Sequence, residues 1–289
     1  MPGGGSAIYR LEIDANELVF SARAAGPENG RPVLLLHGFP QTSWAWRFQL
    51  TALAEAGYRA VAPDQRGYSP GARPRAVSAY ATEHLVSDVL ALADAMEMDT
   101  FDLVGHDWGG MVSWMLATHA PDRIRSLTVV STPHPLALHH ALVAGDAEQQ
   151  RRTDTMEAFR QAKVPEKLLL GPDGSGSGLV TLFSGSGLSD DDVEAYLAVL
   201  TEPGAMTAAL NWYRAMDVKS LLDLKPIAVP TLYVWSTDDA ALGRIAAEAT
   251  SECVTGPYLF EMLVGVNHWI PETAPWDLSR MLLSHLATT

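Results

Sequence analysis

The stretch Gly105-His106-Asp107-Trp108-Gly109 decides how this sequence folds and which chemistry it supports. It has the pattern Gly-x-nucleophile-x-Gly, in which a buried strand turns sharply into a helix and presents the middle side chain above a sheet. Glycine is needed because neighbouring backbone comes very close in this strained turn. We therefore expect a strand that ends here, a helix that follows, and Asp107 held up between them.

An aspartate at the middle position selects a particular kind of reaction. A carboxylate is ionised at neutral pH, so it attacks carbon without a base first removing a proton. The product is an ester between the enzyme and an alkyl group. Such an ester suits substitution at a saturated carbon, as in opening an epoxide or expelling a halide. Asp107 therefore argues against a serine esterase.

Apolar strands and helical segments alternate on both sides of this stretch. That alternation predicts an α/β fold with a mostly parallel, eight-stranded sheet covered by helices on both faces. The expected strands are Ile8–Ile13, Glu17–Ala24, Pro32–Leu36, Tyr58–Ala62, Phe101–Val104, Leu127–Val130, Thr231–Trp235 and Tyr258–Met262. The expected core helices are Trp44–Ala56 with Ser43 as N-cap, Ala79–Met96, Trp108–His119 and Asp277–Leu286.

The strand rhythm stops in the middle of the chain. We interpret residues 133–217 as a helical cap inserted after the sixth strand, and residues 1–132 with 218–289 as the core. The Gly- and Ser-rich stretch Gly171–Gly187 is expected to be a mobile loop on this cap. A disordered insert is the alternative, and aromatic residues such as Phe159 favour a packed cap.

Composition narrows the possible partners. The formal net charge of −14 would repel phosphate backbones and anionic lipids, so neither nucleic acid nor membrane partners are expected. The lone Cys253 excludes an intrachain disulfide, suits a cytoplasmic location and is expected to be a half-buried apolar residue. We find no signal peptide and no apolar run of about 20 residues. No metal-ligand spacing and no phosphate loop is present, so no metal and no cofactor is expected.

An ester on Asp107 must be hydrolysed, which requires a general base. His268 follows the last expected strand and is the candidate. An acid between nucleophile and base in chain order should orient the imidazole. Asp238 and Asp239 both lie after the preceding strand, and the residues alone leave both open.

Other residues are expected to build the site. The backbone N–H groups of Phe39 and Trp108 are the expected oxyanion donors, and the Phe39–Pro40 bond is a candidate cis peptide. Tyr213 is the candidate acid for an epoxide oxygen, because a phenol is neutral at pH 7 and can donate a proton. The expected pocket residues are His37, Pro40, Trp108, Trp212 and Trp269.

Four further features are expected to have structural and not catalytic roles. His106 is expected to pack or hydrogen-bond beneath the turn. Asp64 and Arg66 are expected to fix a loop as a pair. Asp88 and the run 190–192 are expected to be solvated faces or helix starts.

Together these residues resemble the epoxide hydrolases of the α/β-hydrolase fold superfamily, from Ile8 to Leu286. The resemblance implies that Tyr213 is the cap acid and that Asp239, the fifth residue of a Trp-Gly-x-x-Asp loop with serine in place of glycine, orients His268. It also implies a second cap tyrosine, where Thr155 stands. The matching segments are His37-Gly38-Phe39-Pro40, Asp64-Gln65-Arg66-Gly67-Tyr68-Ser69, Gly105-His106-Asp107-Trp108-Gly109-Gly110 and Asn211-Trp212-Tyr213-Arg214.

The leading hypothesis is hydrolysis of a small-molecule epoxide to a vicinal diol, with a single cap donor or a second one from His139 or His140. Haloalkane or haloacid dehalogenation with the same Asp-His-Asp set is the first alternative. Against it, haloalkane dehalogenases often have Asn where Phe39 stands, and fluoroacetate dehalogenases have Arg where Trp108 stands. The second alternative is a catalytically weak ligand-binding protein. A homodimer is left open.

Overall fold

The computed structural model describes residues 7–222 and 224–289, without the side chains of residues 155, 218 and 220. The sheet has eight strands, as predicted, and their order is β1-β2-β4-β3-β5-β6-β7-β8. β2 pairs antiparallel with both β1 and β4, and the remaining neighbours are parallel. The strands are β1 (Tyr9–Ala15), β2 (Leu18–Ala25), β3 (Pro32–Leu36), β4 (Arg59–Pro63), β5 (Phe101–His106), β6 (Ile124–Val130), β7 (Thr231–Asp238) and β8 (Tyr258–Asn267).

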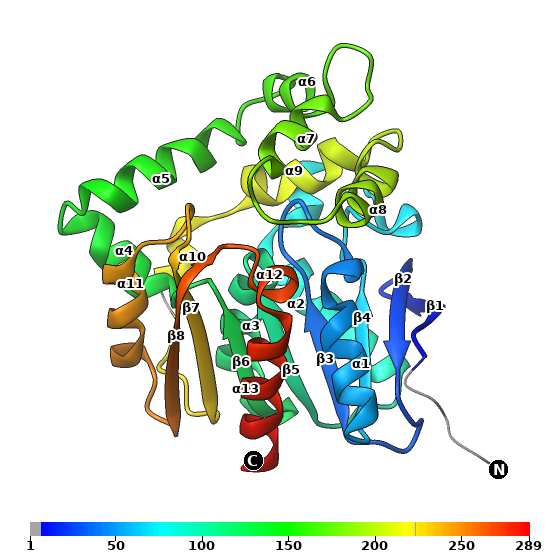
Figure 1. Ribbon diagram of the computed structural model, residues 1–289, viewed down its shortest axis with the longest axis vertical. Helices are drawn as coiled ribbons and strands as arrows, with labels where there is room; N and C mark the ends of the chain where they lie inside the picture. Colours follow the sequence, from blue (N-terminus) through cyan, green and yellow to red (C-terminus); the bar gives the residue numbers. More distant parts are fainter. Residues whose placement is uncertain (1–6, 223) are drawn as a thin grey trace.

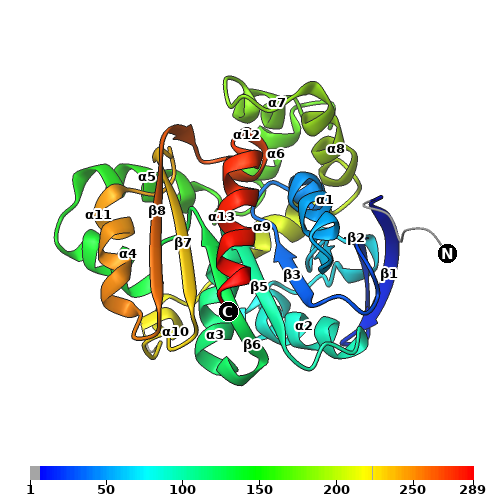
Figure 2. The same ribbon diagram turned by 60° about the horizontal axis from the view of Figure 1, so that its bottom comes forward.

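The inner parallel strands are mostly apolar because helices cover both faces of the sheet there (Figure 2), whereas much of the edge strand β8 is exposed. Successive residues of a strand point to opposite faces, so Leu34 and Leu35 of β3 join different hydrophobic clusters. Helices α2 and α3 pack on the first cluster, and α1 and α13 pack on the second. The core helices are α1 (Arg47–Glu55), α2 (Thr82–Ala95), α3 (Trp108–His119), α11 (Arg244–Ala249), α12 (Ile270–Thr273) and α13 (Pro275–Ala287).

A helical insert, α4 to α10, connects β6 to β7. Figure 1 shows α5 to α9 above the end of the sheet at which the parallel strands terminate. The expected loop Gly171–Gly187 is not continuous, because Ser177–Phe183 within it form a helix that buries Leu179 and Phe183. The insert comprises α4 (Pro135–Val143), α5 (Ala147–Ala158), α6 (Val164–Leu170), α7 (Ser177–Phe183), α8 (Asp190–Leu200), α9 (Ala205–Ala215) and α10 (Val218–Leu222).

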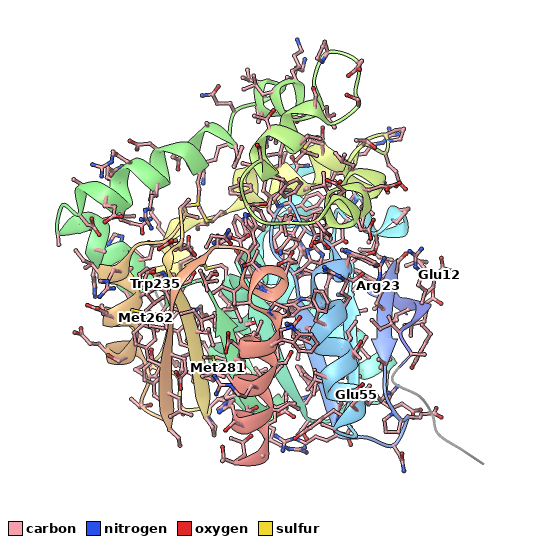
Figure 3. The ribbon with its side chains drawn as sticks, in the orientation of Figure 1. Glu12, Arg23, Glu55, Trp235, Met262 and Met281 are labelled. Carbon is pink, nitrogen blue, oxygen red and sulfur yellow. The ribbon has the colours of Figure 1, made fainter. Side chains whose placement is uncertain are left out.

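Side chains fill the space between the insert and the sheet (Figure 3). Trp235, labelled there near the insert end of β7, is buried and donates its indole N–H to the carbonyl of Leu242 at 3.2 Å. Cys253 is half-buried. In the described part of the chain, no helix is both long and apolar enough to cross a bilayer.

The structure corrects the expected start of the first core helix. A 3₁₀ turn, Ser43–Trp46, precedes α1, and the capping side chain is that of Thr42, which accepts a hydrogen bond from the Trp44 N–H. Ser43 itself is buried, and its N–H donates to a carboxylate oxygen of Asp64 at 2.6 Å.

Two expectations about charged residues were wrong. Arg66 does not pair with Asp64; it forms a bidentate ion pair with Asp88, with both nitrogen–oxygen distances at 2.6 Å. Asp88 is therefore neither solvated nor at a helix start: it lies inside α2 and is 3% exposed. A buried guanidinium requires a buried counter-charge, and helical spacing alone did not reveal which carboxylate supplies it. The run 190–192 does begin a helix, α8, where Asp192 completes a capping box with Ser189.

Candidate active site

Asp107 occupies the tight turn between β5 and α3. Its backbone has φ +51° and ψ −118°, a conformation that costs energy for any residue other than glycine. A Cβ on Gly109 would lie 2.1 Å from the carbonyl oxygen of Leu36, and one on Gly38 would lie 2.4 Å from the Asp107 Cβ. The glycines are therefore required by close backbone approach, and the strained turn lifts Asp107 out of the sheet.

The Asp107 carboxylate lies against backbone amides. The Phe39 N–H donates to Oδ1 at 2.8 Å, and the Trp108 N–H also interacts with the carboxylate. The Phe39–Pro40 peptide bond is cis, as suggested by the sequence. Burial raises the pKa of Asp107, while His268 and the two amides oppose that rise by stabilising the anion. The two expected oxyanion donors thus converge on the carboxylate of Asp107.

His268 lies between two carboxylates. Its Nδ1 is 2.8 Å from Oδ2 of Asp239, and its Nε2 is 3.6 Å from Oδ2 of Asp107. The other Asp239 oxygen accepts the N–H groups of Ala241 and Leu242, at 2.7 and 2.9 Å, which fixes the carboxylate. Burial disfavours the imidazolium, but Asp239 and then Asp107 outweigh burial and raise the pKa of His268 to about 9. Asp238 points away, is exposed and contacts Thr237.

Tyr213 reaches the same place from α9 of the helical insert. Its ring packs edge-on against Trp108, with centroids 5.0 Å apart, and against Phe39 at 5.4 Å. Burial and the charge of Asp107 raise the pKa of Tyr213 well above its ordinary value. The phenol therefore stays protonated and can act as a hydrogen-bond donor.

A cavity of about 170 Å³ lies beside Asp107, Trp108 and Tyr213. Its walls are mostly apolar. Residues from the core and from the insert both contribute to it: Asp107, Trp108, Met111, Thr132, Pro135, Leu138, His139, Leu142, Thr153, Met156, Glu157, Arg160, Tyr213, Met216, Leu221, Leu222 and Leu242.

Four residues that we expected in the pocket are not among the described residues that line this cavity: His37, Pro40, Trp212 and Trp269. The His37 ring is buried outside this lining, and its Nε2 accepts the Gln65 N–H at 3.1 Å. Pro40 is buried in the cis turn. Trp212 donates its indole N–H to the Arg66 carbonyl at 2.8 Å, which turns its ring away from the cavity. Trp269 packs against Phe183.

The position expected for a second cap tyrosine lies in α5, but the side chain of Thr155 is outside the described part of the structure. Of the two histidines considered as substitutes, His139 lines the cavity. His140 lines a separate cavity with His134 and Cys253. Among the described residues, no three His, Cys, Asp or Glu side chains are grouped to hold a metal ion.

Three buried polar residues behind the site were not foreseen from the sequence: Gln41, Tyr196 and Glu272. They connect to His106, which lies beneath the turn and hydrogen-bonds there as expected. The available signal was weak. Gln41 directly follows the cis proline, and Glu272 follows His268 by four residues and lies on α12.

Comparison with known proteins agrees with this geometry. The α/β hydrolase fold family matches residues 31–275. A protein of the AB hydrolase superfamily from Bacillus subtilis is 33% identical, over 95% of this chain and 96% of the relative. Epoxide hydrolase A from Mycobacterium tuberculosis is 31% identical, over 98% of each chain.

Solved structures give the same result. The crystal structure of epoxide hydrolase A from Mycobacterium thermoresistibile superposes with a TM-score of 0.83 and 27% identity, over 97% of this chain and 98% of that one. An aspartate in the sharp turn, a histidine between two carboxylates and a tyrosine from the insert thus occur on a shared fold. The chain belongs to the α/β hydrolase fold family and is an epoxide-hydrolase-like member of it.

Proposed function

We propose that this chain hydrolyses small-molecule epoxides to vicinal diols through a covalent ester on Asp107. The observation that carries the proposal is the position of Asp107: its carboxylate lines one cavity together with Tyr213, and its Oδ2 lies 3.6 Å from Nε2 of His268. A dehalogenase needs the carboxylate and the histidine. A phenol that stays protonated is explained better by an epoxide oxygen that must gain a proton.

The first step follows from the two carboxylate oxygens of Asp107. Oδ1 is held by the Phe39 N–H, which leaves Oδ2 as the attacking atom. Oδ2 forms a bond to a ring carbon while the carbon–oxygen bond of the epoxide breaks. The released alkoxide takes the phenolic proton of Tyr213, and the phenolate then recovers a proton from solvent.

Ester formation itself makes His268 a base. In the resting enzyme the two carboxylates hold the pKa of His268 near 9, so the imidazole is protonated at neutral pH. Alkylation removes the charge of Asp107, which lies 3.6 Å from Nε2. The pKa of His268 then falls, its Nε2 proton leaves to solvent, and a neutral imidazole faces the ester.

The second step breaks the ester. His268 takes a proton from water, and the hydroxide attacks the ester carbonyl carbon. The oxyanion that forms on Oδ1 already faces the amides of Phe39 and Trp108, so little reorganisation is needed. Collapse expels the diol alkoxide, which takes the proton from His268 and leaves Asp107 as a carboxylic acid. Asp107 then passes its proton to His268, which restores the carboxylate and the imidazolium of the resting enzyme.

We infer that residues 133–217 act as a cap over this chemistry. This segment supplies Tyr213 and most of the apolar wall of the cavity. A largely apolar wall excludes water and favours epoxides with hydrocarbon substituents over strongly polar ones.

A substrate panel tests the proposed function. Diol formation from styrene oxide and aliphatic epoxides should far exceed halide release from haloalkanes and haloacids. Tyr213→Phe should abolish most of the epoxide activity, whereas Tyr9→Phe, which changes an exposed tyrosine of β1, should not. Halide release without diol formation would establish dehalogenation instead. Tight ligand binding with no turnover in either assay would favour the ligand-binding alternative.

A further inference from the structure

A buried chain of hydrogen bonds runs from α8 of the insert to the main chain of His268. Tyr196 Oη and Gln41 Nε2 both donate to Oε1 of Glu272, at 2.5 and 2.6 Å. Gln41 Oε1 lies 2.8 Å from His106 Nδ1, and His106 Nε2 lies 2.9 Å from the His268 carbonyl oxygen. All these links are buried. Oε2 of Glu272 is also buried and lacks a partner among the described residues.

This chain of hydrogen bonds needs one more proton than an ionised Glu272 and a neutral His106 provide. His106 lies between two oxygen atoms, the Gln41 amide oxygen and the His268 carbonyl, and neither can donate. A neutral imidazole has one N–H, so it can satisfy only one of them. With Glu272 ionised and His106 neutral, one short contact would therefore join two acceptors, which is costly in a buried site.

Two arrangements of the added proton satisfy every link. In the first, His106 is an imidazolium and Glu272 a carboxylate. In the second, Glu272 carries the proton and the Gln41 amide is rotated by half a turn, which exchanges its oxygen and nitrogen with almost no change of shape. This rotation gives up the long hydrogen bond, 3.3 Å, that the amide oxygen accepts from the Gly38 N–H. The protonated carboxyl then donates to the amide oxygen, the amide NH₂ donates to His106 Nδ1, and His106 Nε2–H donates to the His268 carbonyl.

Burial selects the second arrangement. It lowers the pKa of His106 well below its ordinary value, an effect reinforced by His268 and His37, so the imidazolium is disfavoured. Burial also raises the pKa of Glu272 to about 7, although the hydrogen bonds from Tyr196 and Gln41 favour the anion.

Two further charged side chains near Glu272 act on its pKa in opposite directions. Arg47 of α1 lowers its pKa and Asp192 of α8 raises it. These two residues form an ion pair with each other, at 2.6 Å. The nearby positive charge of His268 also interacts with Glu272.

We propose that Glu272 is a positioning residue, which holds a proton in the working enzyme and thereby keeps His106 donating to the main chain of His268. This role rests on the proposed function of His268 as the base. When Glu272 loses its proton, the Gln41 NH₂ turns toward the carboxylate and its oxygen claims the Nδ1 proton of His106. His106 Nε2 then carries no proton and cannot donate to the His268 carbonyl oxygen that it faces. The loss of this hydrogen bond loosens the loop that carries the base.

The tautomer of His106 tests the inference without any substrate. Nitrogen-15 NMR of the ring should show the Nε2–H form in the wild type below about pH 6 and the Nδ1–H form above about pH 8. Glu272→Gln places a permanent NH₂ donor at this position, so His106 should keep the Nε2–H form throughout. Glu248→Gln, which changes an exposed carboxylate of α11, is the matched control and should behave as the wild type.

Hydrolysis of the preformed ester supplies the functional readout. Above about pH 8, Glu272→Gln should hydrolyse it about fivefold faster than the wild type and the Glu248→Gln control, the effect of one recovered hydrogen bond. A wild-type His106 that keeps one tautomer across this pH range overturns the proposal, even if the variant fails to fold. If the tautomer switches in a protein that has no epoxide activity, the hydrogen-bond assignment survives while the proposed function fails.

Discussion

Replacing Asp107 by asparagine imitates the charge change that ester formation brings about. The structure sets its size, because Asp107 Oδ2 lies 3.6 Å from His268 Nε2 and both side chains are largely buried, with 17% and 10% exposure. At an effective dielectric constant of about 20, two unit charges at this distance attract by about 5 kcal/mol, or about 3 pH units of imidazole pKa.

That value is an upper bound, because Asp239 contributes more than Asp107 to the raised pKa of His268. We therefore expect Asp107→Asn to lower this pKa from about 9 by about 1 to 3 pH units. The sign follows from removing an anion that favoured the imidazolium. The same fall on ester formation would bring the pKa of His268 near neutrality at the step in which the imidazole must accept a proton from water.

An NMR titration of the His268 ring measures this directly, with the wild type and Asp238→Asn as references. Asp238 is the exposed neighbour of Asp239, so its replacement should leave the titration near its wild-type position. An unchanged pKa in Asp107→Asn would refute the reasoning that alkylation switches on the base. A raised pKa would reverse its sign.

Three further predictions concern the cap acid and the buried charges. Tyr213→Phe should slow ester formation by about 10²- to 10⁴-fold and should affect ester hydrolysis far less, as rapid-quench single turnovers would show. Asp88→Ala leaves Arg66 buried without its partner and should lower the free energy of unfolding in urea by about 3–5 kcal/mol, whereas Asp94→Ala, which removes an exposed partner, should cost less than about 1 kcal/mol. Glu272 has a folded-state pKa above its unfolded value, so the cost of ionising it in the folded protein is absent below about pH 4.5 and complete above about pH 7. Across that interval the free energy of unfolding of Glu272→Gln should rise relative to the wild type by up to about 3 kcal/mol. Urea unfolding at several pH values measures this difference.

Much of the fold follows from local pattern. The elbow pentapeptide places both ends of α3 correctly and the end of β5 within two residues, because the crowded glycines fix the turn between them. Strand positions elsewhere follow from apolar runs that both faces of the sheet bury. The α7 helix escaped prediction because glycine and serine on either side of Leu179 suggest a loop, and only contacts with neighbouring cap helices reveal its buried side.

Some residues of the site likewise follow from local pattern, and others depend on tertiary contacts. Asp107, His268 and Asp239 follow strand ends, where chain order and sheet topology bring them together. Trp212 was expected in the pocket, yet its indole N–H is committed to a carbonyl of the core. Glu272 was not foreseen, because its importance comes from a proton shared across segments far apart in the sequence. Tertiary hydrogen bonds of this kind leave no local pattern.

The central claim is that Asp107 carries the substrate as an ester, and one measurement addresses it most directly. A single turnover of excess enzyme with styrene oxide in heavy-oxygen water should place the label in the Asp107 carboxylate, found by mass spectrometry of the peptide that contains it. The first diol released should carry no label, because its new oxygen comes from Asp107 itself. Label in that first diol and none in the peptide would mean that water attacks the epoxide directly, which would contradict covalent catalysis by Asp107.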